Sequence, residues 1–263
     1  MARYHVIAGA TEGVEYPKIR TIALGDVRDA LVRGIDDFKA MPSHVIFLCL
    51  IYPIVGFFLA GLTLGYGVLP LFFPLAAGFA LIGPVAALGL YELSRRREQG
   101  LPADWSHAFD VVRSPSFGAI AALAALLMIL FLSWLAIAQS LYQSLFGYLP
   151  PESIDGFLRQ ILTTPEGWTL ILWGNAAGAL CAAIAFVIGV ISFPLLLDRD
   201  VGAAVALMTS VRAVAKNPVP MAAWGLIVAG MLFIGALPLF VGLAVVMPIL
   251  GHATWHLYRK VIV

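Results

Sequence analysis

Two histidines four positions apart, His252 and His256, have the spacing best suited to chemistry in this sequence. In a helix, this spacing places both imidazoles on one face. Such a pair can hold part of a metal shell or approach a haem, and His44, His107 or Met41 could supply a further ligand. No cysteine or carboxylate lies nearby in the sequence to complete the site. We therefore expect no metal or other cofactor, and we expect the pair to anchor the last helix at the inner head groups.

Catalytic motifs are absent from the rest of the sequence. It has no GxSxG elbow, Walker loop, HExxH zinc motif or dinucleotide fingerprint. Five acidic residues could do acid or base work, and each is explained more simply as part of a solvated face or a helix cap: Asp29, Asp36, Asp37, Glu92 and Glu98. The sequence therefore favours a protein that is not an enzyme.

The elements that must carry these residues are strongly apolar. Hydrophobic residues make up 61% of the chain and charged residues only 12%, whereas soluble proteins have about 25% charged residues. Cys49 and Cys181 lie inside apolar runs, without disulfide or metal spacing, and are expected to be small buried hydrophobes. Nothing in the net charge of +1 favours a nucleic-acid partner. This composition is typical of a membrane protein.

Apolar runs long enough to cross a bilayer, about 20 residues each, occur at four places and in one double-length block. The four runs are 45–63, 69–91, 117–142 and 168–197. The block 219–257 has no Asp, Glu, Lys or Arg and is about twice the required length. We expect it to form two helices with a turn at 235–238, where Pro238 favours a helix end. The predicted fold is all-α, with six transmembrane helices arranged as three hairpins.

The basic residues predict how these helices are oriented. Of the 16 Lys and Arg residues, only Arg159 falls on one side of the predicted spans. Because basic loops stay in the cytoplasm, both termini are expected inside, in a bacterial cytoplasmic (inner) membrane. The run Arg95, Arg96 and Arg97 is either a topology signal of this kind or a contact for anionic lipid head groups.

The predicted organisation has three parts. Residues 1–43 form a cytoplasmic segment with an amphipathic helix, residues 44–258 form the six-helix transmembrane domain, and residues 259–263 form a cytoplasmic tail. Amphipathic segments at 24–38, 104–112 and 200–215 precede the odd-numbered spans, which suggests a threefold repeat. The outer loop 143–167 should contain a short helix on the outer leaflet at 154–162.

Small residues in the fourth predicted span suggest close helix packing. Gly174 and Gly178 form a small-xxx-small pattern, which lets a neighbouring helix approach closely. Asn175 lies between them and is expected to form hydrogen bonds between helices, although it could also line a polar path.

Two stretches of the sequence resemble a known family. NPVPMAAW at 217–224 and VMPILGHATWHLYR at 246–259, together with Asp36, Asp37 and Phe38, resemble the signature of a bacterial family called domain of unknown function 2189. We expect the resemblance to cover about residues 24–260. It implies a multi-helix inner-membrane protein of undetermined activity, and it supplies no site residues.

Three functions remain open on these observations. The first is an accessory, assembly or scaffold protein whose partners are membrane lipids and other integral membrane proteins. The second is a transporter or channel for a small neutral or lipid-like solute, favoured by internal repetition and proline-interrupted helices. The third is a metal- or haem-linked respiratory accessory protein, which would depend on His252 and His256.

Overall fold

The chain folds as an all-helical protein. The computed structural model describes residues 16–41, 56, 61, 69–79, 81, 83–149, 151, 153–238 and 240–263. Within these residues every regular element is a helix, apart from one isolated antiparallel bridge between Ile19 and Ile262. The predicted all-α class is therefore confirmed. Two compact units are formed: unit 1 comprises residues 1–53, 84–125 and 186–263, and unit 2 comprises residues 54–83 and 126–185.

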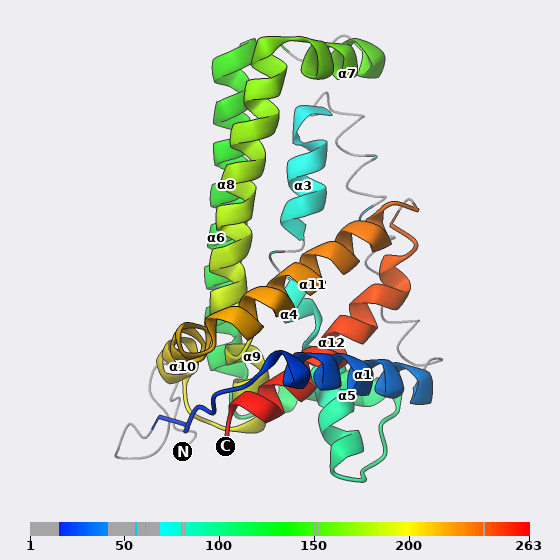
Figure 1. Cartoon of the computed structure of the whole chain (residues 1–263), viewed down its shortest axis with the longest axis vertical. Coiled ribbons are helices and arrows are strands. Elements are labelled where there is room, and N and C mark those ends of the chain that lie inside the picture. The colour runs from blue at the N-terminus through cyan, green and yellow to red at the C-terminus, as the bar shows by residue number, and fades with distance from the viewer. Residues whose placement is uncertain are drawn as a thin grey trace. The chain divides into compact units, whose positions relative to one another are not determined.

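Three helices in the described part of the chain are long and apolar enough to cross a membrane. They are α6 (Phe117–Phe146), α8 (Pro165–Gly189) with its continuation α9 (Ser192–Asp198), and α11 (Pro218–Ala236) (Figure 1). A helix satisfies all its backbone hydrogen bonds internally, so apolar side chains are enough to make it stable in lipid. Helices therefore form where the third, fourth and fifth spans were predicted.

The predicted second span, 69–91, is not one continuous helix. It consists of four short elements, namely η1 (Leu69–Leu71), α3 (Phe72–Phe79), α4 (Gly83–Ala86) and α5 (Leu88–Glu98). Pro84 falls in the first turn of α4, where a missing N–H is tolerated, but it could not continue a helix from α3 without losing a hydrogen bond. The predicted first span, 45–63, lies outside the described residues, except for Gly56 and Gly61, which are helical.

The last apolar block forms two helices, as predicted. α11 ends at Ala236, and α12 (Leu243–Val261) begins after a turn. Pro248 lies inside α12 without ending it. The second half of α12 is polar, and α12 is not among the three helices that meet the length and hydropathy requirement for a span.

The predicted amphipathic segments are also helical. α1 (Leu24–Ala40), η3 (Trp105–Arg113) and α10 (Ala203–Lys216) form in unit 1, and η3 is a 3-10 helix. α7 (Ile154–Thr163) forms in unit 2, where Ser153 caps its first turn by accepting a hydrogen bond from the Gly156 amide at 3.0 Å.

The core of unit 1 surrounds the second half of α12. Helices α1, α5 and α9 pack on this part of α12, and Trp255, Leu257 and Tyr258 are buried there. α1 approaches α12 through small residues, because a Cβ atom added at Gly34 would lie 2.6 Å from the Ala253 backbone nitrogen. The two helix backbones are therefore in close contact.

Chain segments from both ends of unit 1 are joined by hydrogen bonds. The Arg20 amide donates to the Val261 carbonyl at 2.8 Å, and the Val263 amide donates to the Lys18 carbonyl at 3.0 Å. Asn217, buried at the start of α11, accepts a hydrogen bond from the Ile22 amide at 2.8 Å. These bonds fix the segment before α1 against the end of α12.

Unit 2 has a different kind of core. The Trp134 side chain of α6 is buried and donates from Nε1 to the Pro74 carbonyl at 2.9 Å. Two glycines lie against the Trp134 ring. A Cβ atom added at Gly78 of α3 would lie 2.8 Å from the ring, and one added at Gly178 of α8 would lie 3.1 Å from it. The Trp134 side chain therefore packs between a glycine of α3 and a glycine of α8.

Candidate functional site

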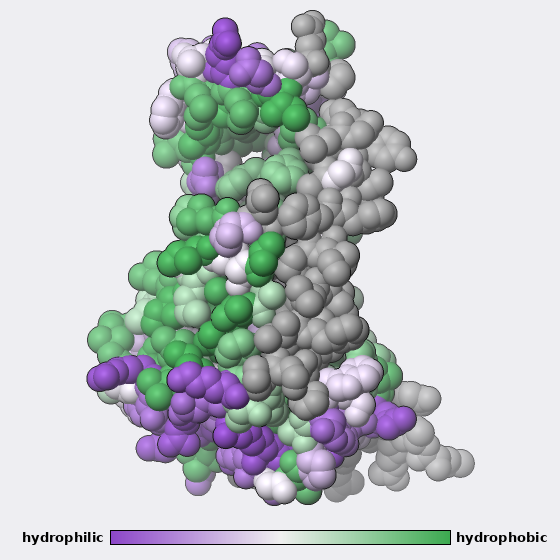
Figure 2. Space-filling model, turned by 90° about the vertical axis from the view of Figure 1, so that its right-hand side faces the viewer, coloured by the Kyte–Doolittle hydropathy of each residue, from purple (hydrophilic) through white to green (hydrophobic). Residues whose placement is uncertain are grey.

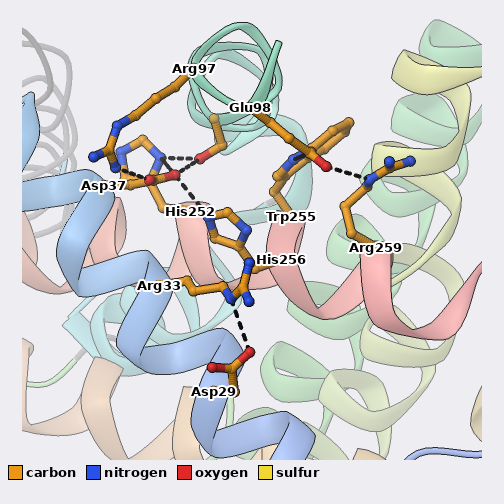
Figure 3. Close-up of polar contacts among 10 residues, drawn as sticks. Asp29, Arg33, Asp37, Arg97, Glu98, His252, Trp255, His256 and Arg259 are labelled. Carbon is orange, nitrogen blue, oxygen red and sulfur yellow. Dashed lines mark hydrogen bonds and ion pairs between the residues drawn. The ribbon is translucent and has the colours of Figure 1, made fainter. Parts of the chain in front are cut away.

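The strongest concentration of polar side chains is centred on Asp37 in unit 1 (Figure 3). α1 places Asp37 on its buried face, and only 4% of this residue is exposed. From α5, the Ser94 hydroxyl lies 2.6 Å from Asp37 Oδ2, and Arg97 donates to Oδ1. From α12, His256 Nε2 lies 2.9 Å from Asp37 Oδ2. Three helices thus converge on one carboxylate.

His252 extends this network by one further hydrogen bond. Its Nδ1 lies 2.6 Å from the Ser94 Oγ atom, which also contacts Asp37. A hydroxyl has one proton, so if Ser94 donates to the carboxylate, His252 Nδ1 must donate to Ser94. His252 Nε2 is then an acceptor, and it is buried without a hydrogen-bond partner among the described residues.

The surroundings of Asp37 favour its charged form. Burial raises the pKa of the carboxyl, but hydrogen bonds from His256 and Ser94 and the charge of His256 outweigh it, so the pKa is lowered from 3.8. An ionised carboxylate accepts several hydrogen bonds and donates none, which matches the donors around Asp37. The arrangement can hold three helices together and share protons among its members.

A second group of polar contacts lies along the same side of α12. Trp255 Nε1 donates to Glu98 Oε2 at 2.9 Å, and Arg259 Nε donates to Glu98 Oε1 at 3.0 Å. The Tyr258 hydroxyl donates to Asp198 Oδ2 at 2.6 Å. These contacts join α12 to α5 and α9.

An open cavity of about 540 Å³ lies beside Asp37 and is lined by charged residues of α1, α5 and α12. It has four basic side chains (Arg33, Arg97, Arg259 and Lys260) and three carboxylates (Asp36, Asp37 and Glu98). Figure 2 shows hydrophilic residues gathered at the lower end of the drawn face.

Each arginine of the predicted run pairs with a different carboxylate. Arg95 Nε donates to Glu92 at 2.8 Å, Arg96 Nη1 lies 3.4 Å from Asp110, and Arg97 pairs with Asp37. Arg95 therefore pairs within α5, whereas Arg96 connects α5 to η3 and Arg97 connects α5 to α1. The topology signal and the lipid contact inferred from the sequence both remain predictions.

The histidine pair lies inside unit 1, among side chains of other helices. His252 is fully buried and His256 contacts Asp37, and the expected position at the head-group boundary stays a prediction. The sequence analysis overlooked α1 as a packing partner for the end of α12. His44 lies outside the described residues, and in the described part of the chain no three His, Cys, Asp or Glu side chains form a group that could hold a metal.

Two carboxylates were also assigned to the wrong environment. Asp37 and Glu92 were explained as solvated residues or caps, yet Glu92 is only 2% exposed and Asp37 only 4%. Ser94, which bridges Asp37 and His252, was not identified from the sequence at all. A usable signal was the spacing of Ala30, Gly34 and Asp37 on one face of α1, since the small residues mark the side that contacts another helix.

The small-residue pattern of α8 is only partly used for packing. Gly178 lies against Trp134. For Gly174, the one described neighbour is the Leu141 side chain, which would lie 4.0 Å from an added Cβ. Asn175 is exposed and donates to the Ile171 carbonyl of its own helix at 2.7 Å. It forms no hydrogen bond to another helix among the described residues, and the expected hydrogen bonds between helices stay a prediction.

The three long apolar helices are typical of an all-helical integral membrane protein. Residues 72–198 match the model of a family described as "Predicted integral membrane protein (DUF2189)". This match confirms the family resemblance, over a shorter stretch than expected, and it includes neither 217–224 nor 246–259, which suggested it. No curated protein and no solved structure matches the chain.

Proposed function

We propose that this protein is a non-enzymatic accessory, assembly or scaffold component that binds other integral membrane proteins and membrane lipids. The observation that carries the proposal is a contrast between the buried carboxylates, which have partners within the chain, and the large apolar side chains, which are exposed. The buried carboxylates are occupied by internal partners, Asp37 by Ser94, His256 and Arg97 and Glu92 by Arg95. The apolar helices, in contrast, leave large side chains uncovered.

α11 shows the uncovered surface most clearly. Leu226, Phe233 and Ile234 are 75%, 67% and 63% exposed. Gly230 lies among them, and a Cβ atom added there would meet nothing within 4 Å. Small residues on an apolar helix face let a second helix approach closely, so this face suits a partner helix.

The proposed topology has six spans as three hairpins, with both termini on the cytoplasmic side of a bacterial inner membrane. The hydrogen bonds between residues 18–20 and 261–263 support it, because they require both ends of unit 1 to lie on one side. Cysteine labelling from outside the cell tests this topology. Residues of the 143–167 loop should react, and a residue placed after Tyr258 should not.

The partner-binding proposal is tested by substituting Gly230. The full chain is extracted in a mild detergent, and the size of the complex and its companions are measured by chromatography and mass spectrometry. Gly230→Leu should release a discrete companion while the chain stays folded, because the added side chain meets only open space. Gly230→Ala is the matched control and should keep it. A wild-type chain that is a lone monomer, free of partner and lipid, would refute the proposal.

A transporter is the second candidate, favoured by the meeting of two helix interruptions in unit 1. An added Cβ at Gly189, where α8 ends, would lie 2.7 Å from the Pro84 side chain of α4. Ser210 donates to the Val187 carbonyl at 2.6 Å and accepts from the Ile191 amide at 3.3 Å, so the broken helix is supported by a side chain. Discontinuous helices recur in transport folds. Uptake by reconstituted vesicles would favour this candidate.

A metal- or haem-linked role is the third candidate and rests on the buried His252 Nε2 atom, which has no hydrogen-bond partner in the described part of the chain. Elemental analysis and a visible spectrum of untagged protein test it. A stoichiometric metal or a Soret band that disappears in His252→Ala would favour it over the accessory role.

A further inference from the structure

We propose that the surface formed by η3 and the start of α6 binds the head group of an anionic phospholipid. This site is separate from the Asp37 cluster. It rests on the lipid-binding part of the proposed function and names the class of lipid. Its argument has three parts: the position of η3, its uncovered apolar side chains and the exposed Arg113 guanidinium beside them.

The position of η3 follows from the helix after it. η3 ends at Arg113, and the apolar helix α6 begins at Phe117. Four residues of extended chain span at most about 14 Å, and the polar head-group layer adds about 5–8 Å on each side of the hydrocarbon core. Arg113 therefore lies within reach of the phosphate layer where α6 enters the membrane.

The apolar side chains of η3 are divided between two surroundings. Ala108 and Val111 are buried. A Cβ atom added at Gly89 of α5 would lie 2.9 Å from the Ala108 side chain, so η3 and α5 are in close contact there. Phe109 and Val112 face outward and are 57% and 62% exposed. An interfacial helix with this division would pack one part of its apolar surface on the protein and insert the other into the acyl boundary.

A cavity of about 350 Å³ lies next to these side chains, and its charges balance, with four arginines (Arg95, Arg96, Arg113 and Arg199) and four carboxylates (Glu92, Asp110, Asp198 and Asp200). Arg113 is the most exposed of the four arginines. Asp110 is shared, because Arg96 Nη1 lies 3.4 Å from one of its oxygens and Arg113 Nη1 lies 3.2 Å from the other. One carboxylate thus faces two guanidinium groups. The Arg113 side chain is 86% exposed and can turn its remaining donors to a phosphate.

The test uses the full chain in detergent, titrated with phosphatidylglycerol or phosphatidylcholine of identical acyl chains and examined by native mass spectrometry. Wild type should bind phosphatidylglycerol more tightly. Arg113→Gln should weaken that binding about fivefold, the effect of one basic residue at an anionic surface, and Arg113→Lys should retain most of it. Arg28→Gln, which removes an exposed charge of α1 that does not line this cavity, should bind as wild type.

Three results would overturn the proposal: unchanged binding by Arg113→Gln, equal weakening by Arg28→Gln, or displacement of the lipid by millimolar inorganic phosphate. The last result would show that the apolar side chains contribute nothing. In nanodiscs, a nitroxide at position 112, in a chain with Cys49 and Cys181 replaced by Ala, should be more accessible to oxygen than to a water-soluble nickel complex. These readouts do not depend on whether a protein partner co-purifies, so they can fail separately from the accessory role.

Discussion

The second half of α12 and the middle of α6 are both helical, but they differ in what surrounds them. In α12, His252, Trp255 and Tyr258 are at most 1% exposed, because α1, α5 and α9 pack around them. In α6, an apolar helix of 30 residues, Ile129 and Leu132 are 63% and 56% exposed. Protein surrounds the first region, and lipid is expected to surround much of the second.

This difference teaches where specific partners are needed. A helix in lipid satisfies its own backbone, so any large apolar side chain suits its lipid-facing positions. The buried polar residues of α12 have no water to bind, and each must find a particular partner on another helix. Substitutions should therefore destabilise the Asp37 cluster far more than the outer surface of α6.

The largest effect is expected from Asp37→Asn. The amide would leave Arg97 and His256 without the carboxylate that they contact. Because the Arg97 side chain is 42% exposed and can reach water, we expect a loss of about 3 kcal/mol, the lower end for breaking a buried ion pair. Thermal unfolding in detergent measures the loss. Asp36→Asn is the matched control, because Asp36 is exposed and forms no ion pair among the described residues. Equal losses in the two variants would break the comparison.

Acid should reproduce part of this effect. The pKa of Asp37 is lowered in the folded state, so its contribution to stability is present above pH 3.8 and is lost as the pH falls through the folded pKa. The loss should not exceed that of Asp37→Asn, since the protonated group keeps its shape. Thermal unfolding at several pH values checks this, and Asp37→Asn should show a weaker dependence below pH 3.8 than wild type. An identical acid dependence in both would contradict the assignment.

Gly34→Ala tests the contact between α1 and α12. The new methyl group would lie 2.6 Å from the Ala253 backbone nitrogen, which cannot move as a side chain can. Overpacking of this kind costs about 1–3 kcal/mol. Gly25→Ala on the same helix has nothing within 4 Å and should leave the melting temperature unchanged or raise it slightly. A stable Gly34→Ala variant would mean that the two helices are not closely packed.

The smallest of these effects is expected in unit 2. Trp134→Phe removes the hydrogen bond to the Pro74 carbonyl and part of a buried, closely packed ring, and should cost about 1–2 kcal/mol. Trp173→Phe, at a residue that is 62% exposed, should have no measurable effect. Both are compared by thermal unfolding, and a loss from Trp134→Phe as large as that from Asp37→Asn would remove the distinction between the two regions.

The lipid-facing helices were predictable from the sequence, and the Asp37 cluster was not. The runs that became α6, α8 and α11 required only length and apolar composition. Asp36 and Asp37 are adjacent and chemically identical, and which of them is buried depends on His256, which is 219 positions away. A proline alone does not show where a helix ends. Pro84 stands in the first turn of α4, whereas Pro248 lies inside α12 without ending it. Long-range packing decides which of the two aspartates is buried.

Hydrogen–deuterium exchange of the full chain in nanodiscs tests the central claim, that Asp37 fastens α1 to α5 and α12. The amides of α1 should exchange slowly in wild type and in Asp36→Asn. In Asp37→Asn they should exchange rapidly, while those of α6 and α8 stay protected. Rapid exchange of α1 in wild type, or equal loss of protection in both variants, would contradict the account.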